Sequence, residues 1–145
     1  MRNNDRCLEL DRQLCFPMYV ASKEIIRKYT PYLDELGITY TQYIVMLVLW
    51  GEEKISMRDL SKRVYLDSGT LTPLLDKLER KGLIERSRNK NDIRTVDIAI
   101  TAKGVGLKVQ AREIPKKIGK CLALSPREAY ELSKILKKIL KKTGE

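Results

Sequence analysis

The chain has 145 residues, of which 29 are Lys or Arg and 19 are Asp or Glu, and its formal net charge is +10. This length fits one domain with extensions, and a composition that is 43% hydrophobic and 33% charged is typical of a folded protein. The longest apolar run, residues 43–50, is too short to span a membrane, and no signal-peptide pattern is present, so we expect a cytoplasmic protein. The sequence contains no histidine, which excludes Ser-His-Asp and Cys-His catalysis and histidine-ligated metal sites, and we expect neither a metal nor a cofactor.

The basic excess is concentrated in two parts of the chain. Residues 58–95 carry a net charge of +4 and residues 116–145 a net charge of +6, whereas residues 1–57 carry −1. Such an excess favours an anionic partner, above all nucleic acid. The alternative is an ordinary soluble protein with a basic surface.

Three cysteines, Cys7, Cys15 and Cys121, are widely spaced. The sequence has no Cys-x-x-Cys motif, which argues against a zinc ribbon or a thioredoxin-type redox pair. In a reducing compartment each cysteine is either an inert buried residue or a reactive thiol.

In chain order, the first predicted element is a long helix over residues 8–36, because apolar residues recur there at spacings of three or four. Pro17 should kink this helix or end a first segment, and Gly37 should terminate it. A second helix is expected over residues 39–50, with Thr41 as its N-cap.

A very short strand at residue 55 and a short helix over residues 56–64 precede the clearest amphipathic segment of the chain. The apolar residues of that segment follow the i, i+3, i+4, i+7 spacing of one helix face: Leu71, Leu74, Leu75 and Leu78. Gly82 should end this helix. Pro73 either opens the regular helix or removes one backbone hydrogen bond from its first turns.

Residues 83–88 and 95–100 alternate apolar and polar side chains and predict a β-hairpin with a polar loop between them. A helical region follows from Thr101, with Pro115 inside it, and Ser125 begins a last helix. The sequence therefore predicts a mainly α fold with a small β-hairpin.

The order of a short helix, a turn, an amphipathic helix and a hairpin with a basic tip is that of a winged helix-turn-helix. Small hydroxyl residues at the start of the amphipathic helix suit close approach to bases and phosphates, and the hairpin tip suits a neighbouring minor groove. The expected DNA-contacting residues are Ser68, Gly69, Thr70, Thr72, Lys77, Arg80, Arg86, Arg88, Lys90 and Arg94. The alternative is an ordinary helical hairpin packed beside a β-hairpin.

This region resembles the recognition helix and wing of MarR-type transcriptional regulators. The resemblance rests on residues 66–75, residues 78–84 and the loop 91–94, followed by Ile100-Thr101 and Gly104. More narrowly, the chain is similar to the organic-hydroperoxide-sensing branch of that family, the OhrR repressors, at these positions: residues 13–16, Tyr19, Tyr29, residues 37–43 and residues 49–50.

The resemblance implies a homodimer that reads a pseudo-palindromic operator. Residues 1–38 and 102–145 would form a helical dimerisation region, and residues 39–101 would form the winged helix-turn-helix DNA-binding domain. It also implies that Cys15 is the peroxide-sensing thiol. Its hydroxyl partners would be Tyr19, Tyr29 and Tyr40. Tyr19 lies four residues after Cys15, on the same helical face.

Family members of the two-cysteine type resolve the oxidised thiol with a second cysteine, and the resemblance favours Cys121 of the partner subunit for that role. Cys7 is the rival. On one straight helix Cys7 and Cys15 would be about 12 Å apart, beyond the limit of about 7 Å for a disulfide.

The leading interpretation is a transcriptional repressor, not an enzyme, that is released from double-stranded DNA when an organic hydroperoxide oxidises Cys15. The first alternative keeps the fold but is controlled by a small aromatic ligand in the dimer cleft. A thiol peroxidase is disfavoured because the helical sequence around Cys15 suggests neither a thioredoxin-like sheet nor an activating arginine. A sequence-neutral DNA-packing protein is the remaining alternative.

Overall fold

A computed structural model describes residues 3–144. Its elements in chain order are two 3-10 helices (Asn3–Leu8 and Leu10–Arg12), α1 (Cys15–Leu36), α2 (Tyr40–Glu52), β1 (Lys54–Ser56), α3 (Met57–Val64), α4 (Ser68–Arg80), β2 (Ile84–Arg88), β3 (Val96–Ile100), α5 (Ala102–Ala111), α6 (Ile114–Leu122) and α7 (Pro126–Thr143). No helix among these residues has the length and apolar character needed to cross a membrane.

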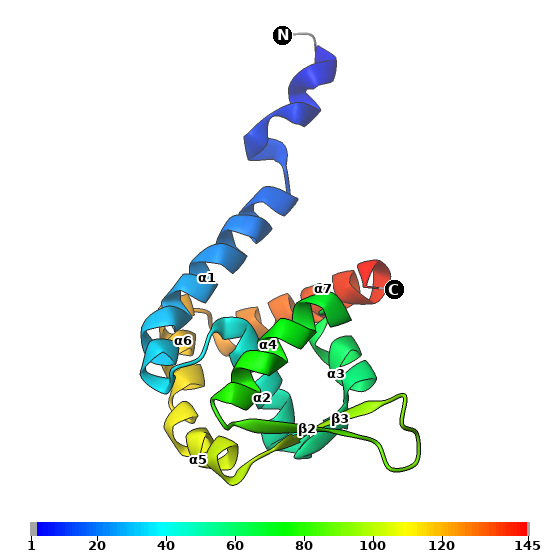
Figure 1. Ribbon diagram of the computed structural model, residues 1–145. Coiled ribbons are helices and arrows are strands. Elements are labelled where there is room, and N and C mark those ends of the chain that lie inside the picture. The colour runs from blue at the N-terminus through cyan, green and yellow to red at the C-terminus, as the bar shows by residue number, and fades with distance from the viewer. Residues whose placement is uncertain (1–2, 145) are drawn as a thin grey trace.

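The winged helix-turn-helix is confirmed. Helices α3 and α4 follow each other across a short turn, and the β2–β3 hairpin projects beside them (Figure 1). The predicted short strand at Ile55 joins the hairpin, so that the sheet has three antiparallel strands in the order β1-β3-β2. Ile98 of the central strand lies opposite Ile55 on one side and Arg86 on the other.

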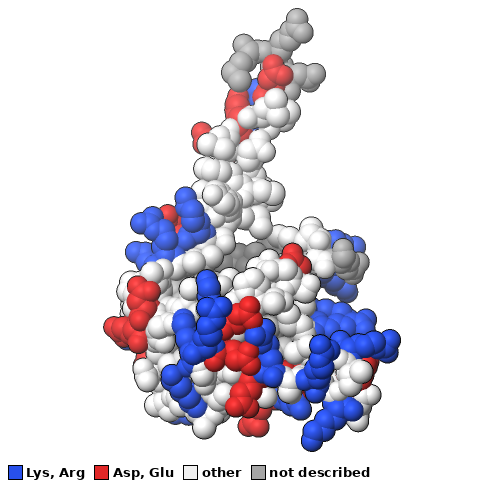
Figure 2. Space-filling view, viewed as in Figure 1, with Lys and Arg blue, Asp and Glu red and all other residues white. Residues whose placement is uncertain are grey.

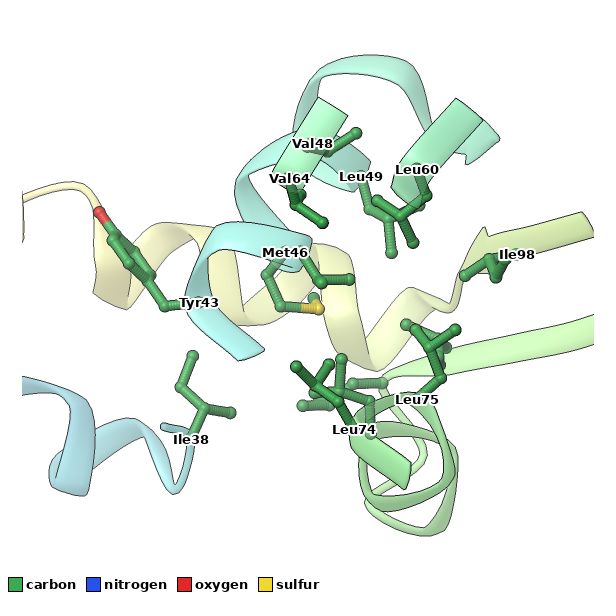
Figure 3. Packing of buried hydrophobic residues seen from close by; sticks show 14 of the residues in the cluster. Ile38, Tyr43, Met46, Val48, Leu49, Leu60, Val64, Leu74, Leu75 and Ile98 are labelled. Carbon is green, nitrogen blue, oxygen red and sulfur yellow. The ribbon is translucent and has the colours of Figure 1, made fainter. Parts of the chain in front are cut away.

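The core fills the space between α2, α3, α4 and the sheet. Figure 3 shows Met46 and Leu49 of α2, Leu60 of α3, Leu75 of α4 and Ile98 of β3 gathered in one cluster, and all five are fully buried. Burying one such side chain is worth about 1.5–3 kcal/mol. Because α4 is held by its leucine face, its opposite, polar face must point to solvent.

Gly104 permits a close contact between α5 and the hairpin. A Cβ atom on Gly104 would lie 2.3 Å from the carbonyl oxygen of Leu83 and 2.7 Å from Cγ1 of Ile100. The carbonyl oxygen of Gly104 accepts a hydrogen bond of 2.8 Å from the indole nitrogen of Trp50. Helix α5 is therefore packed directly on the domain that carries α4.

The N-terminal part of the predicted long helix is wrong. Residues 3–12 form 3-10 turns, and α1 begins at Cys15. Pro17 lies in the first turn of α1, where the backbone N–H that it lacks would have no intrahelical acceptor, so it does not interrupt α1. The prediction for the α2 cap is also corrected. Thr39, not Thr41, is the N-cap of α2 and forms a capping box with Gln42.

The C-terminal helices differ from the prediction at one proline. Pro115 lies in the first turn of α6 and not inside a continuous helix, because α5 has already ended at Ala111. The capping box of Ser125 and Glu128 at the start of α7 is confirmed. Helix α7 contributes no buried residue, and the start of α1 extends away from the body of the molecule (Figure 1).

Candidate DNA interface and thiol site

The polar face of α4 begins at an aspartate cap. The carboxylate of Asp67 accepts a 2.8 Å hydrogen bond from the backbone nitrogen of Thr70, and this bond lowers the pKa of Asp67. Pro73 lies inside α4, so it removes one backbone hydrogen bond from the helix, which is the second of the two alternatives predicted for it. The predicted α4 contacts are all exposed: Ser68, Gly69, Thr70, Thr72, Lys77 and Arg80.

Arg86 differs from the other basic candidates because it is bound to two carboxylates of α4. Its Nη2 atom lies 2.5 Å from Oδ1 of Asp76 and 2.7 Å from Oε2 of Glu79, and its Nε atom lies 2.9 Å from the same Glu79 oxygen. These bonds, chiefly those to Glu79, raise the pKa of Arg86 and lower that of Glu79. Arg86 therefore ties strand β2 to α4 and offers little unpaired charge to a phosphate.

The hairpin loop is ordered by its own hydrogen bonds. The side-chain oxygen of Asn89 accepts from the backbone nitrogens of Asn91 and Asp92, at 2.8 and 3.2 Å. Arg88 donates to the carbonyl oxygen of Ile93 at 2.7 Å. The Arg94 side chain is 88% exposed, with Nε 3.2 Å from Oδ1 of Asp92.

Basic side chains gather on this side of the molecule. Figure 2 shows Lys and Arg over α3 and the hairpin loop, and Lys90 is exposed there. A second group flanks a stripe of acidic side chains over the centre of the same face. The hairpin thus presents Lys90 and Arg94 on the side where α4 exposes its polar residues.

Cys15 is the first residue of α1 and is exposed. Tyr19 lies one turn further along the same helix and is 63% exposed. Tyr29 is 14 residues from Cys15 in one continuous helix, which corresponds to about 21 Å. The structure therefore places Tyr19 near Cys15 but brings neither Tyr29 nor its neighbour Tyr40 to the thiol of the same chain.

Tyr29 and Tyr40 instead form a cluster with Tyr43, a residue that sequence reasoning missed. The ring centroid of Tyr29 lies 5.0 Å from that of Tyr40 and 5.7 Å from that of Tyr43. Burial, followed by the neighbouring tyrosines, raises the pKa of Tyr29 and of Tyr43. Both hydroxyls therefore remain protonated near neutral pH. The available signal was the i, i+3 spacing of Tyr40 and Tyr43 in α2.

The other two cysteines are also exposed. Cys7 lies in a 3-10 helix that is separate from α1, so the straight-helix estimate of its distance to Cys15 does not apply. Cys121 is next to the last residue of α6, which runs beside the C-terminal half of α1, away from the end that carries Cys15 (Figure 1). Among residues 3–144, no group of three or more acidic or cysteine side chains is placed to hold a metal ion.

Comparison with known proteins gives consistent matches along most of the chain. A family model described as transcriptional regulator SarA/Rot matches residues 27–111, more than half of the chain. The HTH-type transcriptional regulator SarZ of Staphylococcus saprophyticus is 47% identical over 142 residues, which cover 98% of this chain and 96% of that protein.

The solved structures of AbfR, a protein of Staphylococcus epidermidis, are also similar. Reduced AbfR bound to DNA matches with a TM-score of 0.76 and 33% identity, over 98% of this chain and 99% of that chain. Disulfide-formed AbfR matches with a TM-score of 0.64 and 33% identity, over 94% and 96%.

Proposed function

Because this chain belongs to the SarA/Rot family of transcriptional regulators, we propose that it is a DNA-binding repressor that acts as a homodimer and releases DNA when Cys15 is oxidised by an organic hydroperoxide. The observation that carries the DNA-binding half is the exposed polar face of α4. In this proposal α4 enters the major groove and the hairpin approaches the adjacent minor groove. AbfR, which is 33% identical, has been solved bound to DNA.

The proposed DNA contacts fall into two groups. The small residues at the start of α4, together with Thr72, approach base edges and phosphates, and the exposed basic residues neutralise phosphates. Arg86 has a positioning role, since it holds β2 against α4. The small-residue group is Ser68, Gly69, Thr70 and Thr72, and the basic group is Lys77, Arg80, Arg88, Lys90 and Arg94.

The homodimer is supported by two uncovered apolar surfaces. Residues 13–22 contain no charged residue, and Figure 2 shows this part of α1 without charged side chains. Leu14 there is 78% exposed. On α7 the exposed apolar residues include Leu132, Ile135, Leu136 and Leu140. A second copy of the chain would cover both surfaces. The dimerisation region is residues 1–38 and 102–145, of which 1, 2 and 145 lie outside the described residues.

The thiol site is completed across the dimer in this proposal. Cys15 and Tyr19 come from one subunit, while Tyr29 and Tyr40 come from the other, because about 21 Å separates Cys15 from Tyr29 within one chain. The Cys15 thiolate attacks a peroxide oxygen, the O–O bond breaks, and the S–O bond of a sulfenic acid forms. The alkoxide that leaves takes up a proton and departs as an alcohol. The exposed apolar side chain of Phe16 beside the thiol favours an organic peroxide.

The sulfenic acid then condenses with a second thiol to form a disulfide, and water is released. We propose Cys121 of the partner subunit as that thiol, because α6, which carries Cys121, lies beside the C-terminal half of α1 and not beside the end that carries Cys15 (Figure 1). Cys7 is the rival. AbfR has been solved in a disulfide form, and this chain superposes better on reduced, DNA-bound AbfR than on that form.

A DNA-binding titration tests the proposal. The probe is a duplex that the reduced protein selects from a random pool, and binding is measured before and after treatment with an organic hydroperoxide. We expect release on treatment, recovery with a thiol reductant, and no release of the Cys15→Ser protein. Binding retained by the treated protein would refute the redox switch, and equal affinity for selected and random duplexes would indicate a DNA-packing protein.

The resolving thiol is tested separately on a non-reducing gel. Peroxide-treated wild-type protein should run as a crosslinked dimer, and the Cys121→Ser protein should run as a monomer. A crosslinked dimer that persists in the Cys121→Ser protein would remove Cys121 from the role.

Control by a small aromatic ligand is the second candidate function, and one cavity favours it. The cavity has a volume of about 320 Å³ and is lined by Tyr43 and Trp50 of α2 and by Lys108 and Arg112 near the end of α5. Aromatic walls with two cations suit a small aromatic acid. Hydroperoxide-induced release by the Cys15→Ser protein, together with release by an aromatic acid, would favour this candidate.

A further inference from the structure

A groove lies between α3, the start of α4 and the hairpin. Its volume is about 560 Å³. Arg58 and Lys62 of α3 line one wall, Arg94 and Thr95 of the hairpin line the other, and Ser68 lies where α4 begins. Sequence reasoning did not include Arg58 or Lys62 among the DNA-contacting residues, because they belong to the first helix of the motif and not to the second.

The lining of the groove is basic. Arg58 and Lys62 are four residues apart on α3, so they share one helix face, and both are exposed. Within residues 3–144 neither forms a salt bridge, whereas the neighbouring Arg63 pairs with Glu52. Among the described residues that line the groove, the single acid is Asp67, whose carboxylate already accepts the backbone N–H of Thr70. The groove therefore offers an anion Arg58 and Lys62, beside Arg94, whose Nε atom is already paired with Asp92.

The position of the groove indicates which anion it would meet. If α4 lies in the major groove and the hairpin in the adjacent minor groove, one DNA strand separates the two grooves. That strand must pass between α4 and the hairpin (Figure 1), which is where the protein groove lined by Arg58 and Lys62 lies.

We propose that this groove binds the sugar–phosphate backbone of that strand, with Arg58 and Lys62 as phosphate-binding residues. The inference rests on the proposed DNA-binding function and adds a surface to it. Because phosphate contacts carry no sequence information, Arg58 and Lys62 should strengthen the binding of every duplex by the same factor, whatever its base sequence. They fix the position of α4 over the bases.

Salt dependence of DNA binding tests the inference. Each phosphate contact contributes about 0.9 to the slope of log affinity against log salt concentration. The Arg58→Ala/Lys62→Ala homodimer lacks two contacts in each subunit, so it should lose about 3.6 from that slope. Between about 50 and 200 mM salt, the wild-type affinity should therefore fall about 150-fold more than that of the double variant. The difference should be the same for a selected duplex and for a random one.

Two control proteins make the result specific. The Arg58→Lys/Lys62→Arg protein keeps both charges and should keep the wild-type slope. The Lys28→Ala/Lys116→Ala protein loses two exposed lysines on α1 and α6, away from the groove, and should also keep it. Because the substituted side chains are exposed, the thermal unfolding midpoint of each protein should stay close to the wild-type value.

The outcomes separate the two proposals. The salt slope of the Arg58→Ala/Lys62→Ala protein could remain unchanged while Thr70→Ala abolishes the preference for the selected duplex. That result would refute phosphate binding by Arg58 and Lys62 and leave the DNA-binding proposal intact. A double variant that loses affinity for the selected duplex alone would also refute it, since that is the behaviour of a base contact. Failure of the wild-type protein to bind any duplex would refute the proposed function itself.

Discussion

Mixed dimers can show whether the thiol site is shared between two subunits. One subunit carries Cys15→Ser, and the other carries Tyr29→Phe and Tyr40→Phe. If the site forms across the dimer, the mixed dimer regains one complete site, with Cys15 from the second subunit and both tyrosines from the first. If it forms within one chain, the mixed dimer has no complete site.

The size of the effect follows from the structure. Within one chain Cys15 and Tyr29 are about 21 Å apart, far beyond hydrogen-bond distance, so the tyrosines of the same chain cannot contact the thiol. Hydrogen bonds to a charged group are worth about 1.5–3 kcal/mol, at least a tenfold effect on the thiolate population. A free cysteine is about 3% thiolate at pH 7, which limits the gain to about thirtyfold. The Tyr29→Phe/Tyr40→Phe homodimer should therefore react about ten to thirty times more slowly than wild type.

The assay is the rate at which the Cys15 thiol is lost under an organic hydroperoxide at pH 7. All subunits also carry Cys7→Ser and Cys121→Ser, so that Cys15 is the one thiol measured. We expect the mixed dimer to react at nearly the rate of the dimer with intact Cys15, Tyr29 and Tyr40. A mixed dimer as slow as the Tyr29→Phe/Tyr40→Phe homodimer would show that the tyrosines do not act across the dimer.

Three further predictions concern packing, pH and assembly. Gly104→Ala should destabilise the fold by about 3 kcal/mol, because its Cβ would meet the carbonyl oxygen of Leu83, and should lower Tm by about 6–12 °C; a thermal melt within about 2 °C of wild type would contradict this. Arg86 lowers the pKa of Glu79, so the stability from this pair is present above pH 4.5 and is lost as the pH falls below it. Urea unfolding of Arg86→Met should lack this acid-dependent part, and an unchanged pH profile would argue against it. Leu136→Asp should weaken the dimer by about 3 kcal/mol, roughly a 150-fold rise in Kd in sedimentation, and an unaffected dimer would mean that α7 lies outside the interface.

The sequence predicts the winged helix-turn-helix well, because the patterns that indicate its helices and strands are local. The spacing of Leu71, Leu74, Leu75 and Leu78 requires one buried helix face, and all four are buried. The alternation of residues 95–100 likewise predicts β3, which begins one residue later. Strand β1 could be expected only as an isolated position, because its pairing with β3 joins residues more than 40 positions apart.

The N-terminal region and the thiol site are less predictable. Leu10 and Leu14 have helical spacing, but they are exposed and precede α1, so their pattern reflects surface that the rest of the chain does not cover. The positions of the tyrosines relative to the thiol also depend on contacts outside one helix. Sequence spacing can place Tyr19 beside Cys15 on one helix face, but it cannot tell whether Tyr29 reaches the thiol from the same chain or from another.

The bonds between Arg86 and α4 restrict how the protein can respond to oxidation. Arg86 holds β2 on Asp76 and Glu79, and the Thr101 hydroxyl donates to the carbonyl oxygen of Gly82 at 2.6 Å, so side-chain bonds link α4 to the hairpin and the hairpin to the residues around α5. In the proposed homodimer, these bonds favour a response in which one subunit shifts relative to the other. The two half-sites that a dimer of this kind binds are about 34 Å apart, which is one turn of the DNA helix. In the proposed switch, oxidation would therefore change the base-pair spacing that the dimer can match, while the sequence read within each half-site would stay the same.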